Sequence, residues 1–164
     1  MKEKNGEHPF GDAGQILFFC LFFVIWGGDS FFLHFSTVLS CSVPMAMRLG
    51  VMALSLIVSS YLFKSGHVVI SHEQRPDYVV SLGAFRYIRH PLYLSVIIFY
   101  FGLIFSTFSL ISSALLILII AFYNFIASYE EKLLEERFRE DYMQYKRRTG
   151  KWIPKLSKVH QQET

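Results

Sequence analysis

The chain has 164 residues, of which 52% are hydrophobic and 17% aromatic, and its formal net charge is +3. The apolar residues form long blocks, which indicates one domain of an integral membrane protein and argues against a soluble enzyme or a nucleic-acid-binding protein. Cys20 and Cys41 lie in or beside apolar segments and lack the spacing of a metal site or disulfide framework. We expect both thiols to be buried and inert.

The N-terminal half contains two predicted membrane helices. Residues 1–15 are polar with three acidic side chains, so we interpret the first apolar block as a retained membrane helix rather than a signal peptide. This first span covers about residues 16–39 and contains Asp29, a charge that marks a functional position, lies near the outer interface or faces the bundle. The second span covers residues 45–63, and a polar connection over residues 64–89 follows it.

The longest apolar stretch runs from Leu92 to Tyr129 and contains no charged residue or histidine over 38 positions. As one helix it would be about 57 Å long, whereas a hydrocarbon core is about 30 Å thick. We therefore predict a hairpin of two spans, 92–107 and 109–129. The turn falls at Ser106–Ser109, where hydroxyl groups bond their own backbone.

A membrane hairpin returns to the surface from which it started. Its entry carries Arg89, His90 and Pro91, and its exit carries Glu130 and Glu131. The sequence therefore predicts that a basic and imidazole cluster meets a pair of carboxylates at one membrane surface.

The region after the hairpin is predicted to form a water-exposed amphipathic helix over residues 130–148. Its apolar stripe recurs at helical spacing and consists of Leu134, Phe138, Tyr142 and Tyr145. Gly150 is expected to end this helix, and Trp152 to lie at the membrane interface. The predicted fold is thus all-α, with about four transmembrane helices and a C-terminal amphipathic cytoplasmic helix.

Positive charge predicts the orientation of these helices. The N-terminal segment, the 64–89 connection and the C-terminal tail carry 2, 4 and 9 Lys and Arg residues. Because basic residues concentrate on the cytoplasmic side, we expect both termini and the face with His90 and Glu130 to be cytoplasmic.

Several sequence motifs for known chemistry are absent. The chain has no Gly-rich dinucleotide motif, no G-x-S-x-G nucleophile motif and no H-E-x-x-H zinc motif. His67 and His72 are interpreted as solvated loop histidines, so no metal site is expected.

The segment from Gly83 to Tyr93 is dense in hydrogen-bond donors and aromatic rings, and it ends where a helix begins. Pro91 suits the first turn of that helix, and the free N–H groups of the turn favour a nearby anion. The alternative interpretation is a basic and aromatic belt beside the membrane.

Two motifs separated by the uncharged hairpin carry a family resemblance. The first is Arg89-His90-Pro91-Leu92-Tyr93, and the second is Glu130-Glu131-Lys132-Leu133-Leu134 with the aromatic residues and Ile153-Pro154 that follow. Together they resemble the isoprenylcysteine carboxyl methyltransferase and phospholipid methyltransferase family of integral membrane enzymes. The resemblance covers residues 77–154.

This resemblance implies a methyltransferase that uses S-adenosyl-L-methionine in the membrane. Glu130 would meet the polar end of the cofactor, because a carboxylate pairs with an ammonium group, and aromatic rings would contact the adenine or the sulfonium. It assigns no catalytic role. The cofactor-binding residues that it implies are Tyr78, Val79, Val80, Phe85, His90, Pro91, Leu92, Tyr93, Glu130 and Glu131.

The chain departs from the family pattern at two positions. Ser95 replaces a glycine, and Ile126 replaces an arginine that helps hold the substrate in the isoprenylcysteine enzymes. We expect a lipophilic acceptor that arrives from the bilayer, such as an isoprenylcysteine-like carboxylate, a lipid amine or a small hydrophobic thiol. The alternatives are an NADPH-dependent membrane reductase of related architecture and a non-catalytic membrane adaptor or haem-binding protein.

Overall fold

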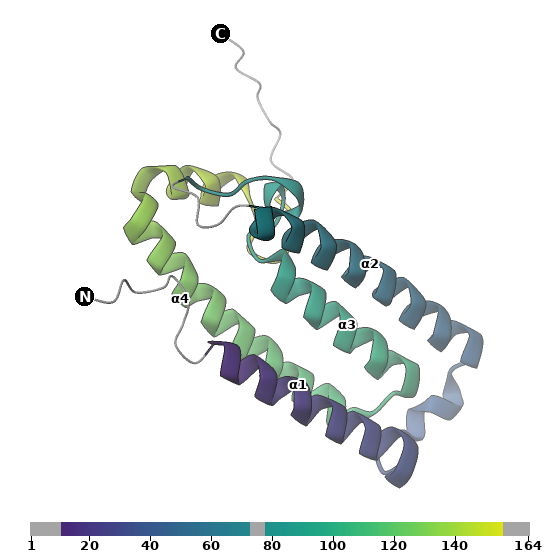
Figure 1. Cartoon of the computed structure of the whole chain (residues 1–164). Coiled ribbons are helices and arrows are strands. Elements are labelled where there is room, and N and C mark those ends of the chain that lie inside the picture. The colour runs from purple at the N-terminus through teal and green to yellow at the C-terminus, as the bar shows by residue number, and fades with distance from the viewer. Residues whose placement is uncertain (1–10, 73–77, 156–164) are drawn as a thin grey trace.

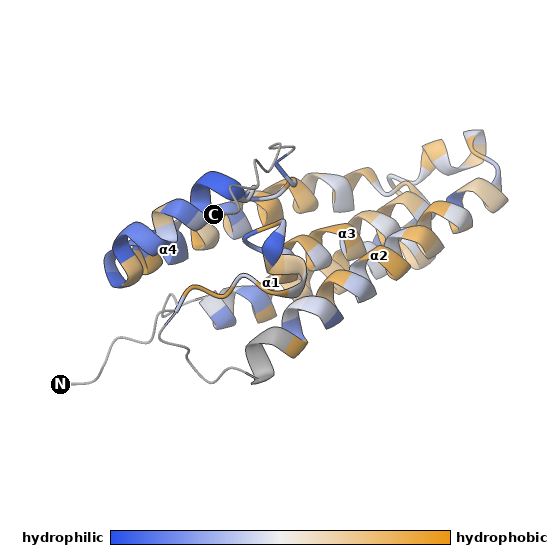
Figure 2. Cartoon of the chain, turned by 90° about the horizontal axis from the view of Figure 1, so that it is seen from above, coloured by the Kyte–Doolittle hydropathy of each residue, from blue (hydrophilic) through white to orange (hydrophobic). Residues whose placement is uncertain are grey.

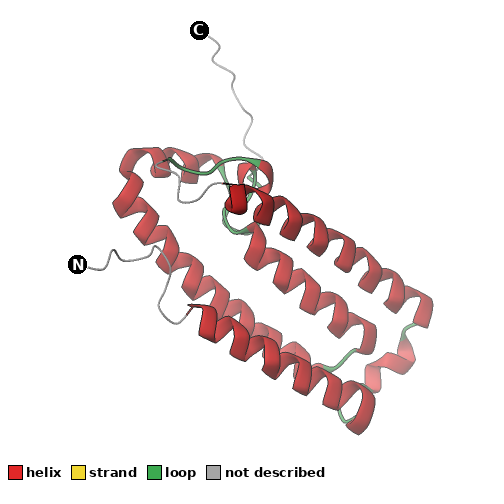
Figure 3. Cartoon of the chain, in the orientation of Figure 1, coloured by secondary structure: helices red, strands yellow, loops and turns green. Residues whose placement is uncertain are grey.

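The computed structural model describes residues 11–72 and 78–155. Within these ranges the chain consists of helices and loops without a strand, so the predicted all-α class is confirmed (Figure 3). The elements in chain order are α1 (Gly11–Gly27), η1 (Gly28–Leu33), η2 (Val38–Ser42), α2 (Met45–His72), η3 (Gly83–Arg86), α3 (Pro91–Thr107) and α4 (Leu110–Arg148).

The four long helices lie lengthwise beside one another, and α3 contacts both α2 and α4 (Figure 1). α1 packs against α4, and the last part of α4 turns across one end of the bundle. This turn coincides with a break in the helical backbone at Arg139, whose φ is 46°. Residues 130–148 are therefore a kinked continuation of the fourth helix, where a separate helix was predicted.

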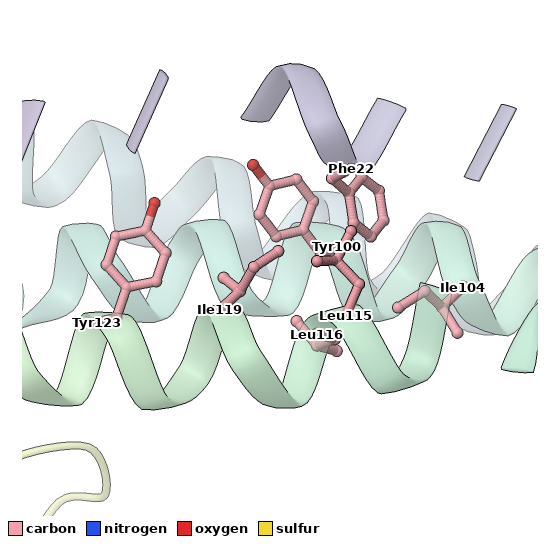
Figure 4. Close-up of a cluster of buried hydrophobic side chains, with 7 residues drawn as sticks. All are labelled: Phe22, Tyr100, Ile104, Leu115, Leu116, Ile119 and Tyr123. Carbon is pink, nitrogen blue, oxygen red and sulfur yellow. The ribbon is translucent and has the colours of Figure 1, made fainter. Parts of the chain in front are cut away.

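The core lies between α1, α3 and α4. Phe22 of α1 packs on Tyr100 of α3 with ring centroids 4.1 Å apart, and aliphatic side chains of α4 close the cluster. The seven buried residues, drawn in Figure 4, are Phe22, Tyr100, Ile104, Leu115, Leu116, Ile119 and Tyr123.

Small residues bring α2 close to α3 at both ends of α3. A Cβ atom at Gly66 would lie 2.9 Å from Leu92, and one at Gly102 would lie 2.6 Å from the Cβ of Ser55. Such close backbone approach suits helix packing in lipid, where van der Waals contact replaces the hydrophobic effect.

Within residues 11–72 and 78–155, three helices are long and apolar enough to cross a membrane: Gly11–Leu33, Met45–Val68 and Leu110–Arg148. α3 is also apolar but shorter, with 17 residues. Figure 2 shows hydrophobic residues along the bundle and hydrophilic residues gathered on the last part of α4. These features are those of an integral membrane protein.

The first two predicted spans have wrong boundaries. The first helical segment covers Gly11–Leu33 rather than 16–39, because His34 adopts a left-handed conformation with φ 50° and turns the chain. α2 continues to His72, beyond the predicted end at residue 63, because its added turns pack on α3 through Gly66.

The predicted hairpin turn is confirmed. α3 ends at Thr107, Phe108 adopts a left-handed conformation with φ 55°, and the Ser109 hydroxyl caps α4 by accepting a hydrogen bond from the Ser112 N–H at 3.2 Å. The prediction for Cys20 and Cys41 was wrong, since both are exposed on the chain surface. Exposed thiols in apolar helices are compatible with contact to lipid.

Candidate functional site

Glu131 is the centre of a charged cluster at the end of the bundle where α4 turns. Its carboxylate Oε1 lies 2.8 Å from Arg89 Nε and 3.2 Å from His90 Nε2, and its Oε2 lies 3.3 Å from Lys146 Nζ. Arg89 and Glu131 are both buried in their side chains, at 8% exposure each. The predicted meeting of the hairpin entry with its exit therefore occurs, 42 residues apart in the chain.

Arg89 also ties the cluster to the end of α4. Its Nη1 donates hydrogen bonds to the carbonyl oxygens of Thr149 at 2.6 Å and of Lys146 at 3.3 Å. A guanidinium at a helix C-terminus satisfies carbonyls that have no partner within the helix and complements the helix dipole. One side chain thus links the start of α3, the middle of α4 and the end of α4.

His90 occupies the position before the first turn of α3 and is buried. Because the Glu131 carboxylate can only accept, the contact assigns the proton to Nε2 and leaves Nδ1 as an acceptor. Burial lowers the pKa of His90, although the hydrogen bond with Glu131 opposes this shift. The neutral imidazole therefore directs a lone pair from Nδ1, which lies 3.7 Å from Glu130 Oε2.

Glu130 is the more accessible of the two adjacent acids. Its side chain is 18% exposed, compared with 8% for Glu131. The Tyr93 hydroxyl donates a hydrogen bond to Glu130 Oε1, and the Tyr93 ring stacks on His90 with centroids 5.7 Å apart. Glu130 and His90 Nδ1 thus present two neighbouring acceptors, whereas Glu131 is committed to cations of the protein.

A cavity of about 220 Å³ lies beside this cluster. Four of the predicted cofactor-binding residues, Tyr78, Val79, Val80 and Phe85, line it together with Arg89. Its other wall is the predicted apolar stripe of the C-terminal region, which the kink at Arg139 folds back over them. The stripe residues and their neighbour in this wall are Leu134, Arg137, Phe138, Tyr142 and Tyr145.

The other predicted cofactor-binding residues lie in two places, the charged cluster and the contact between α3 and α2. His90, Tyr93, Glu130 and Glu131 form the charged cluster, and Arg89 belongs to both the cluster and the cavity. Pro91 and Leu92 instead face α2, where both approach Gly66. Asp77, the first residue of the range that carries the family resemblance, lies outside the described residues.

Sequence reasoning missed two contributors to the site. Arg89 was predicted to meet the carboxylate pair, although not to line the cavity as well. Lys146 contacts Glu131 from the far side of the Arg139 kink, and no local pattern indicated that contact. Trp152 packs against His90 with ring centroids 5.9 Å apart, where we predicted only an interfacial position.

Within the described ranges, no group of three or more His, Cys, Asp or Glu side chains is arranged to hold a metal ion. This end of the bundle offers an aromatic cavity, the Glu130 carboxylate beside His90 Nδ1 and a fixed ion-pair network. Such a combination suits a ligand that has a flat ring and a cationic group.

Comparison with known proteins identifies the family to which the chain belongs. A family model described as phospholipid methyltransferase matches residues 41–141. No curated protein and no solved structure is significantly similar to the chain. The matched range includes α2, the hairpin, the charged cluster apart from Lys146, and most of the cavity wall. This agrees with the resemblance seen in the two sequence motifs. The chain belongs to the phospholipid methyltransferase family of membrane methyltransferases.

Proposed function

We propose that the protein transfers a methyl group from S-adenosylmethionine to a lipophilic acceptor at the cytoplasmic surface of a membrane. The observation that carries this proposal is the juxtaposition of an aromatic cavity with the acceptor pair Glu130 and His90. The family supplies the reaction class, and the geometry supplies the residues that would bind the donor.

The residues present fit the two chemical ends of this cofactor. Phe85, Phe138 and Tyr145 line the cavity with rings that suit an adenine face. Glu130 and the Nδ1 lone pair of His90 are acceptors for an ammonium group, which forms charge-assisted hydrogen bonds with such partners. S-adenosylmethionine, when bound, supplies a methyl group that is activated by the neighbouring sulfonium.

The protein contributes positioning to such a reaction. Methyl transfer is an in-line displacement, and alignment of two reactants supplies a large part of the rate. Arg89 and Glu131 hold the start of α3 against α4, so that His90, Tyr93 and Glu130 keep their relative positions. We assign no general base, because the acceptors that we expect ionise readily.

The placement in the membrane belongs to the same proposal. α3 lies alongside α2 over its whole length and serves as the fourth span, although it is short. The distribution of basic residues supports a cytoplasmic position for both termini and the site. We regard residues 1–164 as one domain, in which residues 77–154 bind the cofactor.

Titration of the detergent-purified protein tests the donor. We expect S-adenosylhomocysteine to bind and NADPH not to bind, and an absorbance scan to show no haem band. Binding of NADPH alone would instead support the reductase alternative, and a Soret band would support the haem protein.

Labelled methyl transfer tests the acceptor. Label should enter a total lipid extract and not a soluble metabolite extract. Label found only in the soluble pool would overturn the lipophilic acceptor and leave the methyltransferase proposal standing.

A further inference from the structure

The loop after α4 is held in place beside His90. The Arg89 N–H donates to the Gly150 carbonyl at 2.9 Å, and the Gly150 N–H donates to the Tyr87 carbonyl at 3.2 Å. A Cβ atom at Gly150 would lie 1.6 Å from the Ile153 carbonyl oxygen, so only glycine fits this tight approach. These two backbone hydrogen bonds fix the position of the backbone at the next residue, Lys151.

The Lys151 ammonium is surrounded by neutral acceptors. Its Nζ lies 2.7 Å from Ser128 Oγ, 2.8 Å from Asn124 Oδ1 and 3.3 Å from the Asn124 carbonyl. Among the described residues no carboxylate forms an ion pair with it, whereas Lys146 pairs with Glu131. Burial lowers the pKa of Lys151, and the Glu131 carboxylate opposes this shift only in part and without direct contact.

This cation lies on the membrane side of the site. Asn124 precedes Glu130 by six residues, which places it about 9 Å further along α4 into the apolar segment, and its side chain is exposed. Trp152, which lies against His90, donates its indole N–H to Asn124 Oδ1 at 3.3 Å. The cluster therefore adjoins both the bilayer and the proposed methyl-transfer site.

The hydrogen bonds leave further donors available. Because Asn124 Oδ1 accepts from both Lys151 and Trp152, its NH₂ group points elsewhere, and no described residue accepts from it. The 3.3 Å contact of Lys151 is the weakest of its three, so an anionic oxygen can replace it. One ammonium and one amide thus provide donors for a single anionic group.

We propose that Lys151 and Asn124 bind the anionic group, a phosphate or a carboxylate, of the membrane lipid that accepts the methyl group. This inference rests on the proposed function only in taking the bound lipid to be the methyl acceptor. The anion-binding site itself does not depend on that function. A charge held near hydrocarbon costs free energy unless it is paired. A lipid headgroup at this depth supplies a counter-charge in direct contact with Lys151 and is held next to Trp152 and His90.

Binding of matched lipids to the full-length protein in detergent tests the site. The phosphate arm compares dioctanoyl phosphatidic acid with dioctanoylglycerol, and the carboxylate arm compares N-acetyl-S-farnesylcysteine with its methyl ester. We expect the wild type to prefer the anionic member of at least one pair by about tenfold, the usual order for one charge-assisted contact. The arm that shows the preference identifies the anionic group.

Variants identify the residue responsible. Lys151→Gln should abolish the preference, and Lys151→Arg should keep most of it. Lys155→Gln is the matched control, because Lys155 is an exposed cation in the same segment that contacts only backbone carbonyls. A preference that survives in Lys151→Gln, or that is lost equally in Lys155→Gln, would overturn the site.

Two further measurements separate this inference from the proposed function. S-adenosylhomocysteine affinity should be the same in Lys151→Gln and wild type, while methyl incorporation at low lipid concentration falls about tenfold. Unchanged incorporation would show a lipid site that is not the acceptor site, and competition by inorganic phosphate as strong as that by lipid would show a general anion site; either result overturns the inference. If the wild type does not bind S-adenosylhomocysteine, that result would overturn the proposed function alone.

Discussion

A buried carboxylate lies at each end of the membrane part of α4, but the first comes from η1 and the two have different partners. At the beginning, Asp29 accepts hydrogen bonds from the Ser36 N–H at 2.9 Å, the Ser36 hydroxyl at 2.5 Å and the Ser109 hydroxyl at 2.6 Å. At the other end, Glu131 is bound by Arg89, His90 and Lys146. Neutral donors surround the first acid and cations surround the second.

This difference separates a polar cluster that closes a helix end from the cluster that we propose to serve binding. The Ser36 hydroxyl and carbonyl also accept from the Ile111 and Leu110 N–H groups, so the Asp29 cluster closes the first turn of α4. The Glu131 cluster instead borders a cavity and a second, more accessible acid, Glu130. A charged residue within an apolar segment is therefore not sufficient evidence of a site.

Substitution of Arg89 should have the largest effect, because it breaks both the ion pair and the cap of α4. Arg89→Ala removes one cationic partner of the buried Glu131 carboxylate and should lower the free energy of unfolding by about 3–5 kcal/mol. We also expect the variant to lose S-adenosylhomocysteine binding. Thermal unfolding in detergent measures the first effect and titration the second. Arg86→Ala, an exposed arginine in the same segment, is the control. Equal stability of the two variants would show that the charged cluster does not hold the fold.

Substitution of Asp29 should lower the stability of the protein without changing its affinity for S-adenosylhomocysteine. Asp29→Ala removes the acceptor for three donors, and the net cost should be about 1.5–3 kcal/mol because the two hydroxyl donors can rotate to other acceptors. The melting temperature should fall while the folded fraction binds S-adenosylhomocysteine like the wild type. Asp29→Asn keeps an acceptor for the Ser36 N–H and should be milder. A change in ligand affinity in either variant would contradict the division between the two ends.

Glu130 and His90 should show the opposite pattern. Glu130→Ala and His90→Ala each remove one of the two neighbouring acceptors, so the affinity for S-adenosylhomocysteine should fall about ten- to a hundredfold. We expect a smaller change in melting temperature than for Asp29→Ala. If both variants bind the ligand as tightly as the wild type, these residues do not form the cofactor site.

The smallest effect should be a pH dependence at the charged end. Because burial lowers the pKa of His90, the unfolded chain takes up a proton below about pH 6.5 that the folded chain does not take up. Stability due to this group is therefore complete above that pH and is lost as the pH falls, by at most about 1.4 kcal/mol per pH unit. Melting temperatures at pH 7.5 and 5.5 should differ less in His90→Gln than in the wild type. Equal differences would show that His90 does not contribute.

The charged end of the bundle was predictable in outline. Hydrophobic length predicted a hairpin, and a hairpin must bring Arg89 and His90 back to Glu130 and Glu131, as observed. The same reasoning could not show that Glu131 is occupied by protein cations. Lys146 reaches it only because the backbone breaks at Arg139, and the helical period of the sequence runs through that position without a signal.

The sequence by itself determined the helical membrane class, the hairpin and the family, because these depend on residue type and local spacing. Tertiary structure decided which helix ends at which residue, how the apolar stripe folds back to enclose the cavity, and how Lys151 reaches Asn124. The physical reason is that each of these depends on contacts between residues far apart in the chain. A kink or an added helical turn is stabilised by such contacts and leaves little trace in the local pattern.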